Sequence, residues 1–159
     1  MSVCRYTPVD ISSITMDQPT LEDVIKTSAV VVHPDRYAYL QCEHVQHDSH
    51  FLVSRDNDEL TVVTKESNVA TTPHIKSEKW FRLIEIRVSV PFITKGFLAK
   101  VTKTIADERL NVLVVSTFSK DYILVRDETH GVAVEALRKV GFPVHFGEPQ
   151  LGKDLAGGL

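Results

Sequence analysis

The sequence has few of the features that mark secreted, membrane-embedded or disulfide-rich proteins. Cysteine is scarce: the chain holds only Cys4 and Cys42, too few for a disulfide framework, and neither belongs to a CxxC pair. No run approaches the roughly 18 consecutive apolar residues of a membrane span, and the first residues lack a basic region followed by an apolar signal core. We therefore expect reduced thiols in a cytoplasmic protein with no membrane partner.

An excess of positive charge is also missing. The formal net charge is −3, the pI is about 6.1, and the lysines and arginines are dispersed along the chain. This leaves no basic field for phosphates and argues against nucleic acid as a partner. No glycine-rich phosphate loop, GxSxG, HExxH or convincing Cys/His arrangement occurs. The spacing therefore indicates no reaction class, and we expect no cofactor.

The first half of the chain is rich in predicted strands. We interpret residues 1–28 as an extension with one short helix at Thr20–Lys26, capped by Thr20 with Asp23 three residues on. Residues 29–33 and 36–42 are typical of strands interrupted by Pro34, and a further strand pair flanks the turn "RDND". The polar, aperiodic segment 67–79 predicts a linker.

The second half shows clearer periods. Residues 80–90 alternate in polarity, as a half-covered strand does, and residues 97–108 have the apolar spacing of an amphipathic helix. The run "NVLVV" suits an interior strand, "YILV" its partner, and a second helix before Gly141 leads to a last strand, "FPVHF". The order βαββαβ predicts an α+β ferredoxin-like sandwich, with an antiparallel sheet covered on one face by helices.

One stretch in this half supports a resemblance. "PFITKGFLAKVTKTIADERLNVLVVSTFSKDYILVRDE" resembles the ACT amino-acid-binding domain. The similar subgroup includes aspartokinase-like regulatory domains, bacterial tandem proteins and the cytosolic arginine sensors of animals. "HPDRYAYL" and "DELTVV" are similar to the degenerate first unit of the tandem proteins. The resemblance, over about residues 30–146, implies an amino-acid-binding protein that regulates or senses through a protein partner, with the ligand at the junction of two units or at a homodimer interface.

The resemblance also implies a division of the chain into two ferredoxin-like ACT units. Residues 1–28 are then an N-terminal extension. Residues 29–66, with part of 67–79, make a degenerate first unit and linker. Residues 80–146 form the second ACT domain, and the glycine-rich residues 147–159 form a flexible tail.

The predicted binding site combines a helix N-terminus with a hairpin loop. An amino acid presents a carboxylate, which suits the free amides after the Lys95-Gly96 turn, and an ammonium, which suits Asp121. The family loop falls on Ser116, Thr117, Phe118, Asp121 and Tyr122, and the family glycine on Gly96. The predicted ligand-binding residues are Phe92, Thr94, Lys95, Gly96, Thr117, Phe118 and Asp121. Equally, the loop side chains can serve only to make the turn.

Lys120 departs from this family pattern. It stands where the related loops usually have a threonine. A cation at this position would change the charge preference of the pocket, so Lys120 leaves the identity of the ligand open.

Two other hypotheses remain open. "CEHVQHDSH" gathers His44, His47 and His50, weak candidates for a zinc or nickel site. Histidines three residues apart drift by about 60° per step around a helix, and no standard zinc spacing is matched, so we predict no metal.

The alternative function is a small isomerase, cyclase or lyase that reuses the pocket for an amino-acid-derived substrate, with His47, Lys120 or Asp121 as acid or base.

Overall fold

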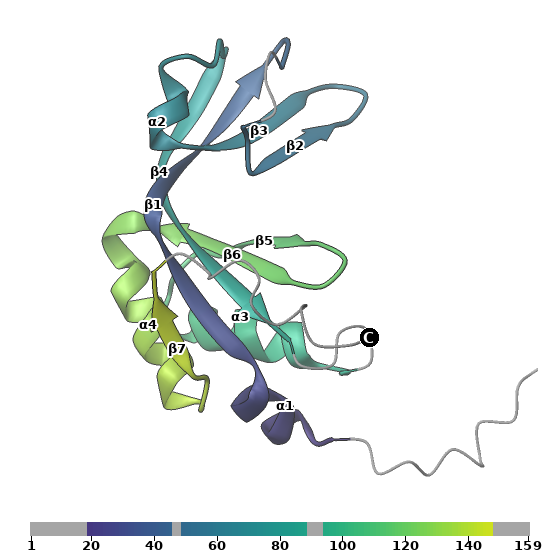
Figure 1. Ribbon diagram of the computed structural model, residues 1–159, viewed down its shortest axis with the longest axis vertical. Helices are drawn as coiled ribbons and strands as arrows, with labels where there is room; N and C mark the ends of the chain where they lie inside the picture. Colours follow the sequence, from purple (N-terminus) through teal and green to yellow (C-terminus); the bar gives the residue numbers. More distant parts are fainter. Residues whose placement is uncertain (1–18, 46–48, 89–93, 148–159) are drawn as a thin grey trace, which may run out of the picture.

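A mixed sheet in two lobes forms the framework of the protein (Figure 1). The computed structural model describes residues 19–45, 49–88 and 94–147. Seven strands in this part run in the order β2-β3-β1-β4-β6-β5, with β7 paired parallel to β1. The strands are β1 (Ala29–Cys42), β2 (Leu52–Arg55), β3 (Leu60–Lys65), β4 (Lys76–Arg87), β5 (Leu113–Ser116), β6 (Asp121–Arg126) and β7 (Val144–Phe146). The helices are α1 (Leu21–Thr27), α2 (Glu66–Val69), α3 (Phe97–Asp107) and α4 (His130–Lys139), with a 3₁₀ turn, η2, at Asp127–Thr129.

The long strands β1 and β4 run through both lobes (Figure 1). Their parts beyond Tyr37 and before Phe81 join β2, β3 and α2 in the first lobe. Their other parts join β5, β6, β7 and the remaining helices in the second lobe. The boundary expected at residue 80 therefore lies inside β4.

Separate apolar clusters fill the two lobes. In the second lobe, Ile84, Ile86 and Ile123 of the sheet pack against Val101 and Leu137 of the helices, which places α3 and α4 on one face. The first lobe has a smaller core around β1, β3 and α2.

A third cluster lies on the opposite face of the sheet and joins the lobes. We call it the inter-lobe cluster. Its members are Tyr37, Tyr39, Phe51, Leu52 and Val63 from the first lobe with Phe81, Leu83, Leu113, Val115, Tyr122 and Leu124.

Most of the predicted elements are present. The α+β fold with helices on one face is confirmed, and the second half follows the order β4, α3, β5, β6, α4, β7. The predicted helix at Thr20 is α1, where the Thr20 hydroxyl accepts the Asp23 amide at 3.2 Å and Asp23 accepts the Thr20 amide at 3.2 Å. No helix among the described residues is both long enough and apolar enough to cross a bilayer. The expected extension and tail lie mostly outside the described residues.

Pro34 does not interrupt β1, contrary to the prediction. Val32 pairs with Ile84 and Arg36 with Arg82, so β1 advances four residues while β4 advances two. This irregularity accommodates a residue that has no amide to donate. The Arg82 guanidinium donates to the Pro34 carbonyl at 2.5 Å, which satisfies an oxygen that the irregular pairing leaves over.

Three further predictions are corrected. Residues 67–79 are not only a linker, because they contain most of α2 and the start of β4. The run "NVLVV" is not an interior strand, since β5 ends the strand order and its side chains alternate between half-buried and exposed. The sheet of the second unit also contains a strand from outside that unit, because β1 lies between β4 and β7.

Candidate functional site

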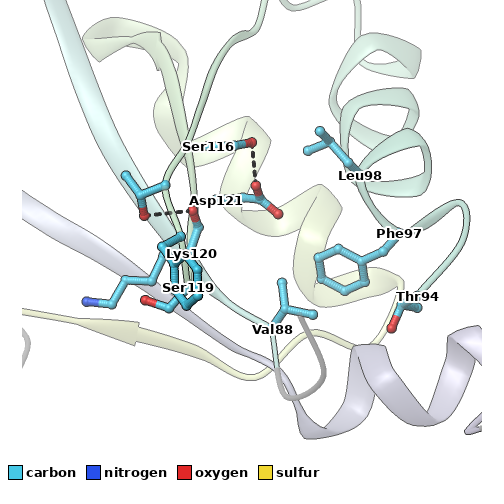
Figure 2. Close-up of a pocket in the computed structure, with 10 residues that line it drawn as sticks. Val88, Thr94, Phe97, Leu98, Ser116, Ser119, Lys120 and Asp121 are labelled. Carbon is cyan, nitrogen blue, oxygen red and sulfur yellow. Dashed lines mark hydrogen bonds between the residues drawn. The ribbon is translucent and has the colours of Figure 1, made fainter. Parts of the chain in front are cut away.

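A cavity of about 250 Å³ lies between the N-terminal end of α3 and the β5–β6 hairpin (Figure 2). Apolar side chains contribute one part of its wall and the polar hairpin the other. The lining residues are Val88, Thr94, Phe97, Leu98, Ser116, Thr117, Phe118, Ser119, Lys120 and Asp121. All of them fall between residues 88 and 121, in the second lobe.

The hairpin register directs Asp121 toward the helices. Ser116 pairs with Asp121, and Asp121 pairs with Ile86 of β4, whose side chain belongs to the helix-covered core. Directly paired residues project from the same face of a sheet, so Ser116 and Asp121 face α3. The Ser116 hydroxyl donates to Asp121 Oδ1 at 2.6 Å, which fixes the carboxylate at the cavity (Figure 2).

The turn itself is closed by its own hydrogen bonds. The Thr117 amide donates to the Lys120 carbonyl at 2.8 Å, and the Thr117 hydroxyl donates to the same oxygen at 3.1 Å. Phe118 and Ser119 therefore form the tip, where Phe118 is 87% exposed. The Thr117 hydroxyl already uses its hydrogen within the hairpin and offers a ligand only acceptor capacity.

The opposite wall begins at the left-handed turn before α3. Gly96, with φ +78°, is the N-cap of α3, and it has no side chain with which to satisfy the first amides of the helix. Such amides and the positive end of the helix dipole favour an anion. Phe97 and Leu98 of this first turn, with Val88, give the cavity its apolar surface.

Lys120 points away from this cavity. It is one residue out of phase with Asp121, and its Nζ lies 3.0 Å from Oε1 of Glu85 on the other face of the sheet. In Figure 2 its amine is directed away from α3. Lys120 contributes its backbone to the cavity wall and its charge to Glu85.

Glu85 is the buried centre of a group of charged side chains, which we call the Glu85 cluster. Its side chain is 1% exposed, and besides Lys120 it contacts Arg87 Nε at 2.6 Å and His33 Nε2 at 3.1 Å. Burial raises the pKa of Glu85, but the hydrogen bonds from Arg87, Lys120 and His33 outweigh burial and hold this pKa below its ordinary value. The carboxylate stays charged in the folded protein at neutral pH.

Six of the seven predicted ligand-binding residues lie at or beside the cavity. Thr94, Thr117, Phe118 and Asp121 line it. Lys95 and Gly96 form the turn next to it, before α3. Phe92 lies outside the described residues. The structure thus brings the two predicted halves of the site together, while ligand binding by these residues stays a prediction.

The histidine-rich segment forms no metal centre among the described residues, where no three potential ligands come together. His44 lines a separate cavity with His74. The His50 Nδ1 is 2.9 Å from the Thr64 hydroxyl. His47, the weak catalytic candidate, lies outside the described residues.

The sequence interpretation missed the role of Glu85. The alternation of residues 80–90 predicts a polar outer face for Glu85, and no spacing in the sequence connects Glu85 with His33. The one available signal was an acidic residue inside the otherwise apolar run "LIEI". Its three partners come from β1, β4 and the β5–β6 turn, which only the strand pairing brings together.

The part of the chain that contains the cavity matches a known protein family. Residues 76–139 match the ACT domain family. The ACT-domain match begins with β4 and ends with α4, so it contains every residue that lines the cavity. No curated protein sequence matches the chain significantly.

Solved structures show the same fold over a larger part of the chain. A Vibrio cholerae protein of unknown function, described as a possible transport protein, is 20% identical with a TM-score of 0.66, covering 77% of this chain and 96% of its own. An Agobacterium tumefaciens protein is 18% identical with a TM-score of 0.65, covering 79% and 97%. The ligand-free regulatory subunit of Thermus thermophilus aspartate kinase is 10% identical with a TM-score of 0.54, covering 73% and 98%. The similarity therefore extends beyond the ACT-domain match, and at these identities it concerns the fold alone.

Proposed function

We propose that the protein is an amino-acid-binding regulatory protein whose ligand occupies the cavity between α3 and the β5–β6 hairpin. One observation carries this proposal: the Asp121 carboxylate, fixed by Ser116, faces the N-terminal turn of α3 across a cavity. The location of this cavity within the ACT-domain match supports it.

The two walls are complementary to the two charges of an amino acid. Asp121 accepts hydrogen bonds from the ammonium group. The Phe97 amide already donates to the Thr94 carbonyl at 3.5 Å, so the amides that follow it in the first turn of α3 would donate to the carboxylate. The cavity, at about 250 Å³, is smaller than the roughly 300–1,000 Å³ of sites for drug-sized molecules. This size suits one small metabolite.

Regulation would pass through the strand that carries Asp121. The neighbouring residue Tyr122 faces the inter-lobe cluster, where its ring centroid is 4.9 Å from that of Phe51. A ligand that orders the hairpin would favour the lobe arrangement in which Tyr122 and Phe51 pack together, provided that it binds this arrangement more tightly. A protein partner, or a second copy of the chain, would then detect the change.

A thermal-shift panel of the twenty amino acids at millimolar concentration tests binding. We expect at least one to raise the melting temperature, because a ligand that binds only the folded state stabilises it. Asp121→Asn should weaken that ligand at least tenfold, since the amide loses the charge that pairs with the ammonium. Sedimentation with and without the ligand measures whether a homodimer forms.

Asp107→Asn is the matched control. Asp107 is an exposed residue of α3, paired with Lys103 at 2.8 Å, and it does not line the cavity. This variant changes the net charge equally and should leave affinity unchanged. The proposal is wrong if no amino acid shifts the wild-type protein, or if Asp121→Asn binds as tightly as Asp107→Asn does.

A further inference from the structure

We infer that the cavity selects amino acids with small uncharged side chains over acidic ones, and that Glu85 sets this selectivity by holding the Lys120 ammonium outside. The inference rests on the proposed function, because it names the ligand class of the same site. It addresses the question of ligand charge that Lys120 leaves open at the level of sequence.

The geometry follows from the alternation of side chains in paired strands. Asp121 and Ile86 are directly paired and project toward the helices. Glu85, one residue before Ile86, therefore projects from the opposite face, and Lys120 extends from the hairpin turn toward the same face (Figure 2). Their side chains meet there, with Lys120 Nζ 3.0 Å from Glu85 Oε1.

Glu85 holds Lys120 firmly because the carboxylate is buried. At 1% exposure it cannot exchange its partners for water, so each hydrogen bond that it loses is costly. If Lys120 swung into the cavity, Glu85 would keep only Arg87 and His33. The lysine therefore remains on the far face while a ligand binds.

Among the described residues that line the cavity, Lys120 and Asp121 carry charge. Asp121 directs its carboxylate to the cavity, whereas the Lys120 ammonium points away from α3 toward Glu85 (Figure 2). An acidic ligand would bring a second carboxylate close to Asp121 while the Lys120 ammonium is held on the other face by Glu85, so like-charge repulsion disfavours it. Val88, Phe97 and Leu98 offer contact to a short aliphatic or hydroxylated side chain instead.

Calorimetric titration of the wild-type protein with alanine, serine, valine, aspartate and glutamate tests the selectivity. The best neutral ligand should bind about tenfold or more tighter than either acidic one. In Glu85→Gln the released Lys120 can turn toward the cavity, and the ratio of neutral to acidic affinity should fall at least fivefold.

Two further variants locate the cause of the change. Lys120→Met should keep the wild-type ratio within about twofold, because its ammonium is absent from the cavity already. The double variant Glu85→Gln/Lys120→Met should restore the wild-type ratio. Lys120→Met keeps the inference testable even if Glu85→Gln does not fold.

The outcomes separate the two proposals. If no amino acid binds the wild-type protein, the proposed function fails and the selectivity inference falls with it. If a neutral amino acid binds but aspartate or glutamate binds as tightly, only the inference is overturned. A change of more than threefold in the ratio on Lys120→Met also overturns it, because the ammonium would then already act on the ligand.

Discussion

At the scale of single residues, Glu85 contacts three basic side chains, more than any described residue of the cavity lining has as ion-pair partners. Its carboxylate orders Arg87 and Lys120 on one face of β4 and fixes His33 of β1 at 3.1 Å. The result is a compact group of charges in which each cation has a fixed direction. Substituting Glu85 should therefore affect stability as well as ligand choice.

We predict that Glu85→Gln lowers the free energy of unfolding at pH 7 by roughly 2 kcal/mol, because charge-assisted hydrogen bonds from Arg87 and Lys120 are lost while both partly exposed cations regain water. The pKa of Glu85 is lowered by folding. Its stabilising contribution is thus complete above the ordinary glutamate pKa of about 4.3 and is lost as the pH falls through the lower folded pKa. Urea unfolding at pH 7 and at several pH values below 4.3 measures the difference.

The stability difference between wild type and variant should shrink on acidification. Glu78→Gln is the matched control, because Glu78 is also on β4 and paired with Arg126 at 2.9 Å, but its side chain is 69% exposed. It should change stability by less than about 1 kcal/mol. Equal effects of the two substitutions at pH 7 would contradict the assigned role of Glu85.

The sequence allowed part of this residue-level description. Asp121 and Thr94 could be located because a hairpin loop and a helix N-terminus leave recognisable patterns of glycine, polar residues and apolar runs. The direction of the Lys120 side chain could not be predicted from the sequence, since a shift of one residue in strand register moves a side chain to the other face of the sheet. The partners of Glu85 depend on pairing between β1 and β4, which are distant in sequence.

At the scale of elements, α4 shows two glycines with opposite requirements. Gly141 follows the helix with φ +102°, where its amide donates to the Arg138 carbonyl at 2.9 Å. Gly131 lies in the first turn of α4 without a positive φ. An added Cβ would meet nothing within 4 Å at Gly131 and only a Cγ2 of Ile25 at 3.8 Å at Gly141. Backbone conformation, and not crowding, separates the two.

We predict effects of opposite sign. Gly141→Ala should destabilise the protein by about 1–2 kcal/mol, because a side chain is strained at positive φ. Gly131→Ala should stabilise it by about 0.5 kcal/mol through better helix propensity and a less flexible unfolded chain. Thermal unfolding of both variants under one set of conditions measures this, and the same direction of change in both would contradict the argument.

Elements whose apolar residues recur at a regular spacing could be predicted from the sequence. The features of β1 and β5 that depend on pairing with distant strands could not. The 3.6-residue spacing of Val101 and Ile105 was enough to find α3. The continuity of β1 through Pro34 depends on Arg82 from another strand. The edge position of β5 depends on which strands pair, which its apolar sequence does not encode.

At the scale of the whole molecule, β1, β4 and the inter-lobe cluster tie the lobes together. Phe51 lies between Tyr37 and Tyr122, with ring centroids 5.9 Å and 4.9 Å away. Neither lobe can lose its fold without disturbing two strands that the other lobe also uses. We therefore expect the lobes to unfold as one unit.

Two spectroscopic probes test this expectation. Trp80, the chain's single tryptophan, packs against the core of the first lobe, whereas far-UV circular dichroism is dominated by α3 and α4 of the second. Their urea midpoints should coincide in the wild-type protein. Phe51→Ala should lower the free energy of unfolding by about 2 kcal/mol and shift both midpoints to the same lower urea concentration. Separate midpoints in the wild-type protein would contradict unfolding as one unit.

The pairing of β1 with β4 in the second lobe determines how the chain connects the two lobes. The strands Ala29–Val32 and Ile84–Arg87 are neighbours in the second lobe, and everything between them in sequence belongs to the first lobe or the crossing point. In topological terms, the first lobe is the greatly enlarged loop of a single β-hairpin. Cutting the chain near residue 80 would thus leave the first lobe nearly whole and separate β1 from its β4 partner in the second lobe. Replacing the enlarged loop with a tight turn would instead shorten the protein and keep β1 beside β4 and β7.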